Sequence, residues 1–427
     1  MSLPGRTSRR RSTRAALSLL AAAILLALPS IARGQVRKPA EPRRPKFQVV
    51  RDTNSAGAYY YHGLSVIDRN PQEAADAFYW ASRLDPDWAD PYFARRVALH
   101  LTNPHGLDDY LDGDSRVRSS PERRRADSLS RRAFLIDPFL YRRLERRLVD
   151  EMLEDARREY SREYAARNGE DPGLLPVRLN PVELANRNPR LAGWVAYTDG
   201  KFADALHYFA DAIKHDPKAY DLHSERADVF YLVTQYDSAL AELQVMLDAM
   251  RKLDDKKLIP FYDSKAMFEY EVGRVHVMRG DLAAARAAYG RALTEDMSFY
   301  MAHAAIGDVA LAQRDTAAAL AEYAQAVDIA ADEPGLRYKY GVALFNAMKY
   351  EDAAEQFRQA IALDPYFAKP YYPLAYILEG TGKDSAAVAS YEGFLQRAPA
   401  ADSTVAGEVR KRLTELRSVS ASTATRH

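Results

Sequence analysis

The chain has 427 residues, with 60 Lys and Arg against 59 Asp and Glu, and it contains no cysteine. Without cysteine the chain cannot form a disulfide framework, a cysteine-ligated zinc or iron–sulfur site, or a cysteine nucleophile. The formal net charge of +1 argues against a global electrostatic grip on nucleic acid, and the 47% hydrophobic content argues against wholesale disorder.

Residues 1–34 are predicted to be a cleavable signal peptide. They contain six arginines and no acid, and their apolar run 15–28 ends at Pro29, before small residues that suit a signal peptidase. This run is shorter than the roughly 20 apolar residues that a membrane-spanning helix needs, so cleavage is favoured over retention as an anchor. We therefore expect an exported protein, periplasmic or extracellular, with no stable membrane span after cleavage. The Pro-rich, basic residues 35–55 are predicted to be a linker.

Three columns of residues recur at a step of 34 residues in the second half of the chain. The first column is Gly273, Gly307 and Gly341, continued by Ala375. The second column, 12 residues later, is Ala285, Ala319, Ala353 and Ala387. The third column, four residues further on, is Tyr289, Tyr323, Phe357 and Tyr391. Small residues let paired helices approach closely and an aromatic residue on the same face fills the gap, so each unit is predicted to be an antiparallel helix pair.

The same columns recur upstream and divide the chain into units. They are occupied by Gly193, Ala205 and Phe209, by Ala227 and Ala239, and by Gly63, Ala74 and Phe78. We predict one fair and one degenerate unit over 56–140, two units over 186–253, an insertion at 254–265, and four units over 266–401. An amphipathic helix over 402–418 is predicted to cap the last unit, and residues 419–427 are predicted to be disordered.

The segment between the two repeat blocks is charged and irregular. Residues 116–167 contain fifteen arginines and ten acidic residues, which interleave along the chain. We therefore predict a charged helical spacer and linker over 141–185 and no nucleic-acid-binding surface. A calcium loop at 108–119 is disfavoured, because Tyr110 and Ser119 stand where such a loop places oxygen ligands.

No combination of residues predicts catalysis, a metal or a cofactor. His207, His215 and His223 recur every eight residues, and that step does not place ligands on one helical face. The sequence has no phosphate-binding glycine loop, zinc-protease motif or nucleophile elbow. We therefore expect a protein that is not an enzyme and that binds no cofactor.

The repeated columns resemble those of the tetratricopeptide repeat family over 186–253 and 266–401, and less closely over 56–89. His223, Glu269 and His303 stand where the family usually has a bulky tryptophan or tyrosine, so the small-residue columns carry the resemblance. The resemblance implies an all-α, right-handed solenoid of antiparallel helix pairs that acts as a non-catalytic scaffold for a protein or peptide partner. A structural subunit of a cell-envelope assembly is the alternative role.

In this family the first helix of each unit lines a concave groove, and the resemblance implies groove residues here. These candidates are Arg190, Trp194, Tyr197, Asp228, Tyr231, Tyr270, Arg274, Tyr338, Phe345, Asn346, Lys369, Tyr372 and Tyr376, and Met278 and Asp308 share their columns. Aromatic side chains with scattered cations suit an extended peptide, although rings in helical arrays often pack against the neighbouring repeat instead. The Lys/Asn/Arg clamp that some family members use for a terminal carboxylate is not reproduced.

Overall fold

The computed structural model describes residues 41–46, 52–102, 188–254 and 264–424, together with the short stretches 128–129, 132–133, 136–137 and 185–186. The chain divides into two units, Met1–Arg43 and Arg44–His427, and every helix described here lies in the second. The predicted signal peptide, the possible calcium loop, the charged spacer and most of the insertion lie outside the described residues.

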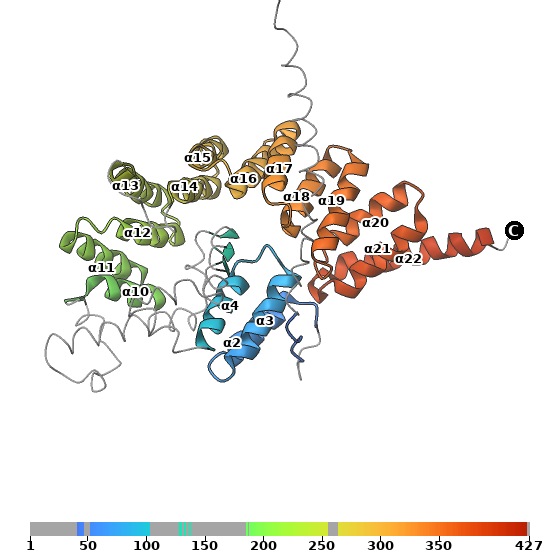
Figure 1. The fold of residues 1–427 in the computed structure, drawn as a ribbon, viewed down its shortest axis with the longest axis horizontal. Helices are drawn as coiled ribbons and strands as arrows, with labels where there is room; N and C mark the ends of the chain where they lie inside the picture. The colour runs from blue at the N-terminus through green and yellow to red at the C-terminus, as the bar shows by residue number, and fades with distance from the viewer. Residues whose placement is uncertain are drawn as a thin grey trace, which may run out of the picture. The chain divides into compact units, whose positions relative to one another are not determined.

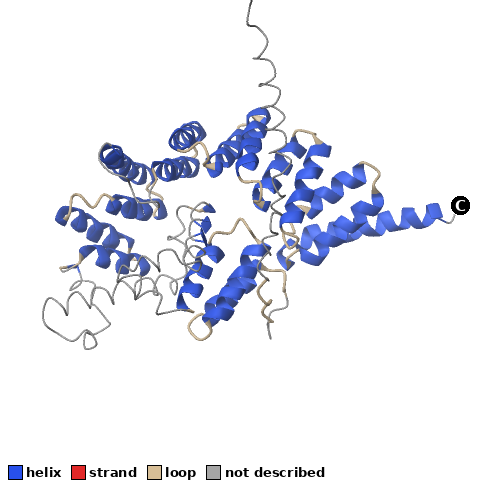
Figure 2. Ribbon diagram, in the orientation of Figure 1, coloured by secondary structure: helices blue, strands red, loops and turns tan. Residues whose placement is uncertain are grey.

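The described part of the chain is all-α, as predicted, and contains no strand (Figure 2). Its first helices are α2 (Ala56–Val66), α3 (Pro71–Leu84), α4 (Asp90–Leu101), α10 (Pro189–Thr198), α11 (Phe202–His215), α12 (Asp221–Leu232) and α13 (Tyr236–Asp254). They are followed by α14 (Lys265–Arg279), α15 (Leu282–Glu295), α16 (Tyr300–Ala312), α17 (Thr316–Ile329), α18 (Pro334–Asn346), α19 (Tyr350–Leu363), α20 (Tyr371–Gly380), α21 (Asp384–Arg397) and α22 (Ser403–Ala424). Figure 1 shows these helices coloured in chain order. None of the described helices combines the length and apolar character that a membrane-spanning helix needs.

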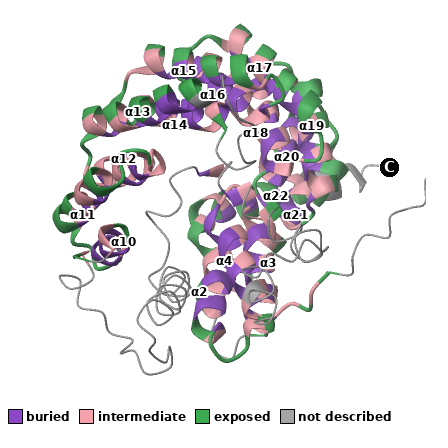
Figure 3. Cartoon of the chain, turned by 60° about the vertical axis from the view of Figure 1, so that its left-hand side comes forward, coloured by how far each residue is buried: buried purple, intermediate pink, exposed green. Residues whose placement is uncertain are grey.

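Consecutive helices pair, and each pair then packs on the next one along the chain. Buried residues lie on the faces by which neighbouring helices meet (Figure 3). The first helix of a pair ends in a tight turn with a left-handed residue, and this residue is Gly280 in one unit and Met348 in another. Aspartates cap the second helices α15 and α17: Asp281 accepts a hydrogen bond from the backbone amide of Ala284 at 3.0 Å, and Asp315 accepts one from Ala318 at 3.1 Å.

The predicted contact between small and aromatic columns is present in the helix pairs. A Cβ atom on Gly341 would lie 2.6 Å from the ring of Phe357, and one on Gly63 would lie 2.6 Å from the ring of Phe78. Both rings are fully buried. Glycine is therefore required at these positions because an aromatic ring occupies the space that a side chain would fill.

The N-terminal helix pair packs against the turn between α19 and α20, a contact that the sequence did not predict. Trp80 of α3 meets Tyr366 edge to face with ring centroids 4.9 Å apart. Arg83 forms an ion pair of 3.2 Å with Asp364, whose carboxylate is buried. Residues far apart in the sequence are thus joined by a ring contact and an ion pair within the second unit.

One described residue of the predicted linker also belongs to this contact. The Nε of Arg44 donates a hydrogen bond of 2.7 Å to the hydroxyl of Tyr59. Its guanidinium also lies 5.1 Å from the centroid of the Trp80 ring. The basic charge at this point of the chain is therefore used in a specific cation–π contact.

The C-terminal helix caps the last pair but is longer than predicted. Val409 and Leu413 of α22 are buried in a cluster that includes Phe394 of α21. The helix continues to Ala424, so its predicted end at 418 and the predicted start of a disordered tail at 419 are wrong. Once a helix is formed, each further residue adds a backbone hydrogen bond at little cost, so the helix extends past its last apolar contact.

Candidate functional site

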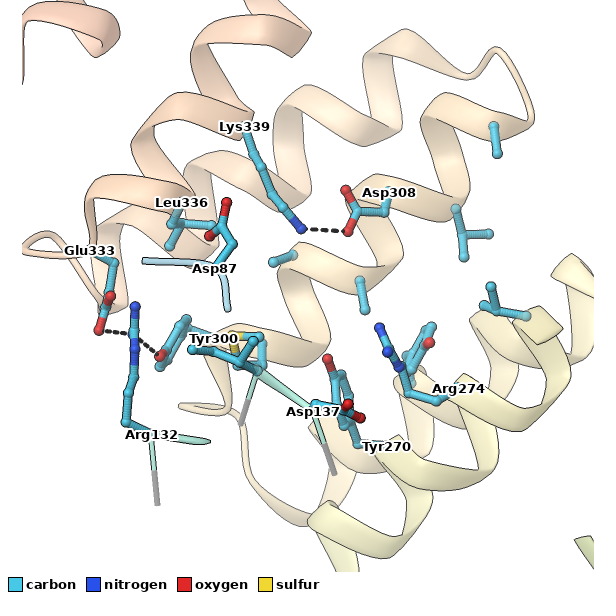
Figure 4. A pocket seen from close by; sticks show the side chains of 18 of the residues that line it. Asp87, Arg132, Asp137, Tyr270, Arg274, Tyr300, Asp308, Glu333, Leu336 and Lys339 are labelled. Atoms are coloured by element: carbon cyan, nitrogen blue, oxygen red, sulfur yellow. Dashed lines mark hydrogen bonds and ion pairs between the residues drawn. The ribbon is translucent and has the colours of Figure 1, made fainter. Parts of the chain in front are cut away.

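A cavity of about 380 Å³ lies on the first helices of three consecutive units, α14, α16 and α18. Apolar side chains form much of its wall, including Val277, Met301, Val309 and Leu336. Asp87 and the stretch that contains Arg132, Ile136 and Asp137 also line it, although these residues come from the N-terminal part of the chain. Figure 4 shows Arg132, Glu333 and Tyr300 together in one region of the cavity and Asp137, Tyr270 and Arg274 together in another.

Small residues on the middle helix account for the space. Tyr270 of α14 and Tyr338 of α18 each stand three residues before the glycine of their unit, and Ala304 stands at that position in α16. Ala304 and its neighbour Ala305 both line the cavity. A missing ring at one position of a repeated column therefore leaves a hollow between two units that keep theirs.

The first group of polar residues in the cavity has an acid, Glu333, on the helices α10 to α21, which we call the array. Glu333, at the start of α18, forms an ion pair with Arg132, whose Nη1 also donates a hydrogen bond of 3.0 Å to the hydroxyl of Tyr300. Burial raises the pKa of Glu333 above its ordinary value, and the charge of Arg132 opposes that shift. Burial likewise raises the pKa of Tyr300 to about 12, so its phenol stays protonated at neutral pH.

The second group of polar residues in the cavity has a base, Arg274 of α14, on the array. The guanidinium of Arg274 is half-buried and interacts electrostatically with Asp137 and with the hydroxyls of Tyr270 and Tyr289. Among the described residues, Arg274, Tyr270 and Tyr289 make no hydrogen bond through these side-chain groups. Burial raises the pKa of both tyrosines, so each keeps its proton and can donate. Three donors therefore face one cavity, and a half-buried cation there favours an anionic group.

A third set of polar groups pairs across two units. Lys339 of α18 donates a hydrogen bond of 3.0 Å to Asp308 of α16. The hydroxyl of Tyr323 donates to the other carboxylate oxygen of Asp308. These groups already satisfy one another, and Lys339 and Asp308 form a paired part of the cavity wall (Figure 4).

Of the predicted groove residues, Tyr270 and Arg274 line this cavity together. Tyr270 is only 2% exposed, and its ring packs edge to face on Phe299 at 5.3 Å. It therefore contributes its hydroxyl to the cavity and its ring to the packing between units.

The remaining candidates do not line the cavity. Arg190 pairs with Asp221 at 2.7 Å and with Glu225. Lys369 pairs with Asp85 of the N-terminal helix pair at 3.3 Å. The half-buried or exposed side chains without a place in the cavity are Trp194, Asp228, Tyr231, Tyr338, Phe345, Asn346, Tyr372 and Tyr376, whereas Tyr197 is buried.

Several cavity residues were not among the predicted candidates. Lys339, Tyr289, Tyr300 and Glu333 come from the array, and Arg132 and Asp137 come from the stretch that packs on it. Ala304 could have indicated the cavity, because it stands in α16 where α14 and α18 have Tyr270 and Tyr338. No local pattern indicates that Arg132 and Asp137 reach α18 and α14.

The described residues contain no group of three or more His, Asp or Glu side chains placed to hold a metal ion. His223 instead contacts Glu242 of the paired helix at 2.6 Å, and His207 contacts Asp211 one turn away at 3.3 Å. These contacts account for two of the three histidines that recur every eight residues.

Comparison with known proteins identifies the class of the repeats. Residues 190–251 and 270–334 match the model of the tetratricopeptide repeat. They contain α10 to α13 and most of α14 to α17, which includes two of the three helices that form the cavity. Comparison with curated protein sequences finds no match.

The chain is also similar to solved structures. One is the C-terminal part of a TPR repeat-containing protein from Cytophaga hutchinsonii (16% identity, TM-score 0.41, covering 52% of this chain and 83% of that one). A second is YrrB, a TPR protein with an unusual peptide-binding site (19% identity, TM-score 0.38, covering 48% of this chain and 97% of that one). A third is MamA from Desulfovibrio magneticus RS-1 (18% identity, TM-score 0.36, covering 42% and 94%).

Proposed function

We propose that this protein is a non-catalytic scaffold that binds a segment of a protein partner in the cavity on α14, α16 and α18. Tetratricopeptide repeats favour such a role, since each unit adds a helix face to an extended surface. The observation that carries the proposal is that Arg274, Tyr270 and Tyr289 face the cavity without a hydrogen bond among the described residues. Apolar walls supply contact area, and these polar groups supply orientation.

The mixed character of the cavity favours a peptide over a small apolar ligand or a nucleic acid. Among the residues that line the cavity are an acid from α18's N-terminus, Glu333, and a base from α14, Arg274, together with apolar residues of α16. A peptide segment can present side chains of both signs at fixed spacing, whereas a polyanion would meet Glu333, Asp308 and Asp87 as like charges.

The test is to select peptides on the full chain and then remove the basic group of the cavity. Sixteen-residue peptides from a random display library are selected on the immobilised wild-type protein, and their affinities are measured by fluorescence anisotropy. We expect Arg274→Gln to weaken the selected peptides roughly 10-fold to 100-fold, since a hydrogen bond to a charged group contributes about 1.5–3 kcal/mol. The matched control is Arg279→Gln in the same helix, where the arginine pairs outside the cavity with Asp237 and Asp281. Equal affinity for wild type and Arg274→Gln contradicts the proposal.

We also propose that the protein is exported, on the basis of residues 1–34. The mature chain would begin near Gln35 and act in the periplasm or outside the cell. N-terminal sequencing of the protein from separated cell fractions tests this proposal. A mature N-terminus in the exported fraction is the expected result, and an intact Met1 on protein confined to the cytoplasm contradicts it.

A further inference from the structure

We propose that the turn containing Arg132 and Asp137, hereafter the internal turn, forms one wall of the cavity and covers a surface of α14, α16 and α18 to which the partner binds. We propose further that it copies the partner: a helical turn with a cation and, five residues later, a carboxylate. This inference rests on the proposed function of the cavity. It adds the order of charges along the partner segment, and it identifies the internal turn as a part of the chain that competes with that segment.

The cationic residue of the internal turn is held by three groups of the described chain. Arg132 forms an ion pair with Glu333 and donates a hydrogen bond of 3.0 Å to Tyr300. The guanidinium also lies 5.6 Å from the ring centroid of Tyr92 in α4. The first two partners belong to the array and line the cavity, so Arg132 is bound in the way that a ligand side chain would be bound.

The other described residues of the internal turn are 133, 136 and 137. The amide of Asp137 donates a hydrogen bond of 2.9 Å to the carbonyl of Ala133, which closes one turn of helix. Ala133 is fully buried, and Ile136 and Asp137 line the cavity. Asp137 is 7% exposed and interacts electrostatically with Arg274 (Figure 4).

The two charges of the internal turn therefore lie beside opposite charges of the array. If the turn left the cavity, Glu333 would lose the arginine that pairs with it, and Arg274 would lose its acidic neighbour. What would remain is a hollow with an acidic group in one place, a basic group in another, and Ala304 and Ala305 in its wall. Such a site discriminates by charge order, because a segment with the reversed order would meet like charges at both places.

The internal turn thereby defines the chemistry of the partner segment. It presents a basic residue, an apolar residue four positions later and an acidic residue directly after that. Residues four apart on a helix share a face, so the base and the apolar side chain meet the cavity together and the acid follows at the end of the turn. We infer that the partner carries this arrangement and competes with the internal turn.

The experiment supplies the internal turn as a separate peptide to the full chain. The probe is a fluorescein-labelled peptide with the sequence of residues 127–141, and its control has Arg132 and Asp137 exchanged, so that composition is identical. The receptors are the wild-type chain and the variant Arg132→Gln with Asp137→Asn, which removes both charges but keeps side-chain size. Circular dichroism and thermal melting verify that the variant is folded, and the single variant Asp137→Asn serves if the double variant is not.

We expect the peptide to bind the variant at least 10-fold more tightly than the wild type, because an attached competitor reduces apparent affinity by the fraction of sites it leaves open. We expect the charge-exchanged peptide to bind the variant at least 10-fold more weakly than the native-order peptide. Equal binding to wild type and variant, or equal binding of the two peptides, overturns the inference. If peptides selected from the random library still need Arg274 for binding, the proposed function stands while the inference fails. A failure of the inference is therefore distinguishable from a failure of the proposed function.

Discussion

Gly341 shows how a single residue holds a helix pair together. The ring of Phe357 lies where its Cβ would be, so the helices are closer than any larger residue permits. This column was predictable from the sequence because the 34-residue step repeats it several times. A small residue, Gly or Ala, that recurs in one column of the units performs a structural task that they share.

We predict that Gly341→Ala lowers the free energy of unfolding by about 1–3 kcal/mol, because the added methyl group overlaps a buried ring. The matched control is Gly290→Ala in α15, where an added Cβ meets no atom within 4 Å. That control should raise stability by about 0.5–1 kcal/mol, since alanine loses less entropy in a helix than glycine. Denaturant titrations followed by circular dichroism measure both. Equal effects of the two substitutions would show that close helix contact does not select glycine.

The polar residues that replace the usual bulky aromatic were not explained by the sequence. His303 contacts Glu322 at 2.8 Å, and the equivalent His223 contacts Glu242 at 2.6 Å. Each contact joins the first helix of a unit to its second helix, 19 residues further along the chain. The sequence shows the departure from the family pattern, but only the paired geometry shows that a polar bridge takes the place of a packed ring.

Glu225 carries a prediction about pH. Burial raises its pKa to about 7 from 4.5, against the opposing charge of Arg190. Between these two values the folded state holds a proton that the unfolded state has lost, so stability falls as the pH rises from 4.5 to 7. We expect Glu225→Gln to remove this fall and to gain up to about 3 kcal/mol over wild type between pH 4.5 and pH 8.

Urea titrations at a series of pH values measure this effect, with the exposed Glu408→Gln in α22 as the control for removing a carboxylate. If the difference in stability between wild type and Glu225→Gln is the same at pH 4.5 and pH 8, Glu225 is not the group that titrates.

At the scale of helices, the sequence predicted which helices form and which ones pair. It did not predict how the N-terminal helix pair packs on the later repeats. The repeat predicted the pairs from α10 to α21, because each pair is built from residues close in sequence. The packing of α3 on the turn between α19 and α20 depends on partners such as Trp80 and Tyr366, which are 286 positions apart in the chain. Nothing in either local pattern points to the other.

A double-mutant cycle on Trp80 and Tyr366 tests this docking. We expect Trp80→Ala and Tyr366→Ala to couple by about 0.5–1.5 kcal/mol, as edge-to-face rings do. Pairing Trp80→Ala with Tyr350→Ala, whose ring packs on Phe345, should give additive effects. Stability is measured by denaturant titration for each variant, and additivity of both pairs would mean that α3 does not pack on this turn in solution.

The capping helix carries a prediction at the same scale. Leu413 is 5% exposed and joins the cluster that includes Phe394. We expect Leu413→Ala to cost about 2–5 kcal/mol of local stability, because it leaves a cavity over the last pair. Hydrogen exchange should then show lost protection in α21 and α22, whereas Lys411→Ala on the exposed side should not. Unchanged protection in α21 would show that α22 does not cap the array.

For the whole molecule, the repeat predicted a solenoid scaffold but did not locate its binding site. The resemblance distributed candidates over all first helices, yet Tyr270 and Arg274 are the two of the thirteen groove candidates that line the cavity, with Asp308 from one of their columns. The reason is physical: a cavity arises where the repeat is broken, here at Ala304, and where a distant stretch such as the internal turn approaches. Both are departures from periodicity, so the repeated pattern does not indicate them.

The most direct test of the account is to locate a bound peptide on the protein. A photoreactive benzoylphenylalanine is placed at Met301, in the wall of the cavity, and in a second version at Met297, which is 81% exposed and does not line the cavity. Peptides selected on the wild-type chain are added, the samples are irradiated, and cross-links are identified by mass spectrometry. We expect cross-links from position 301, at least 10-fold fewer of them in Arg274→Gln at the same peptide concentration, and none from position 297. Cross-links from position 297, with none from position 301, would contradict it.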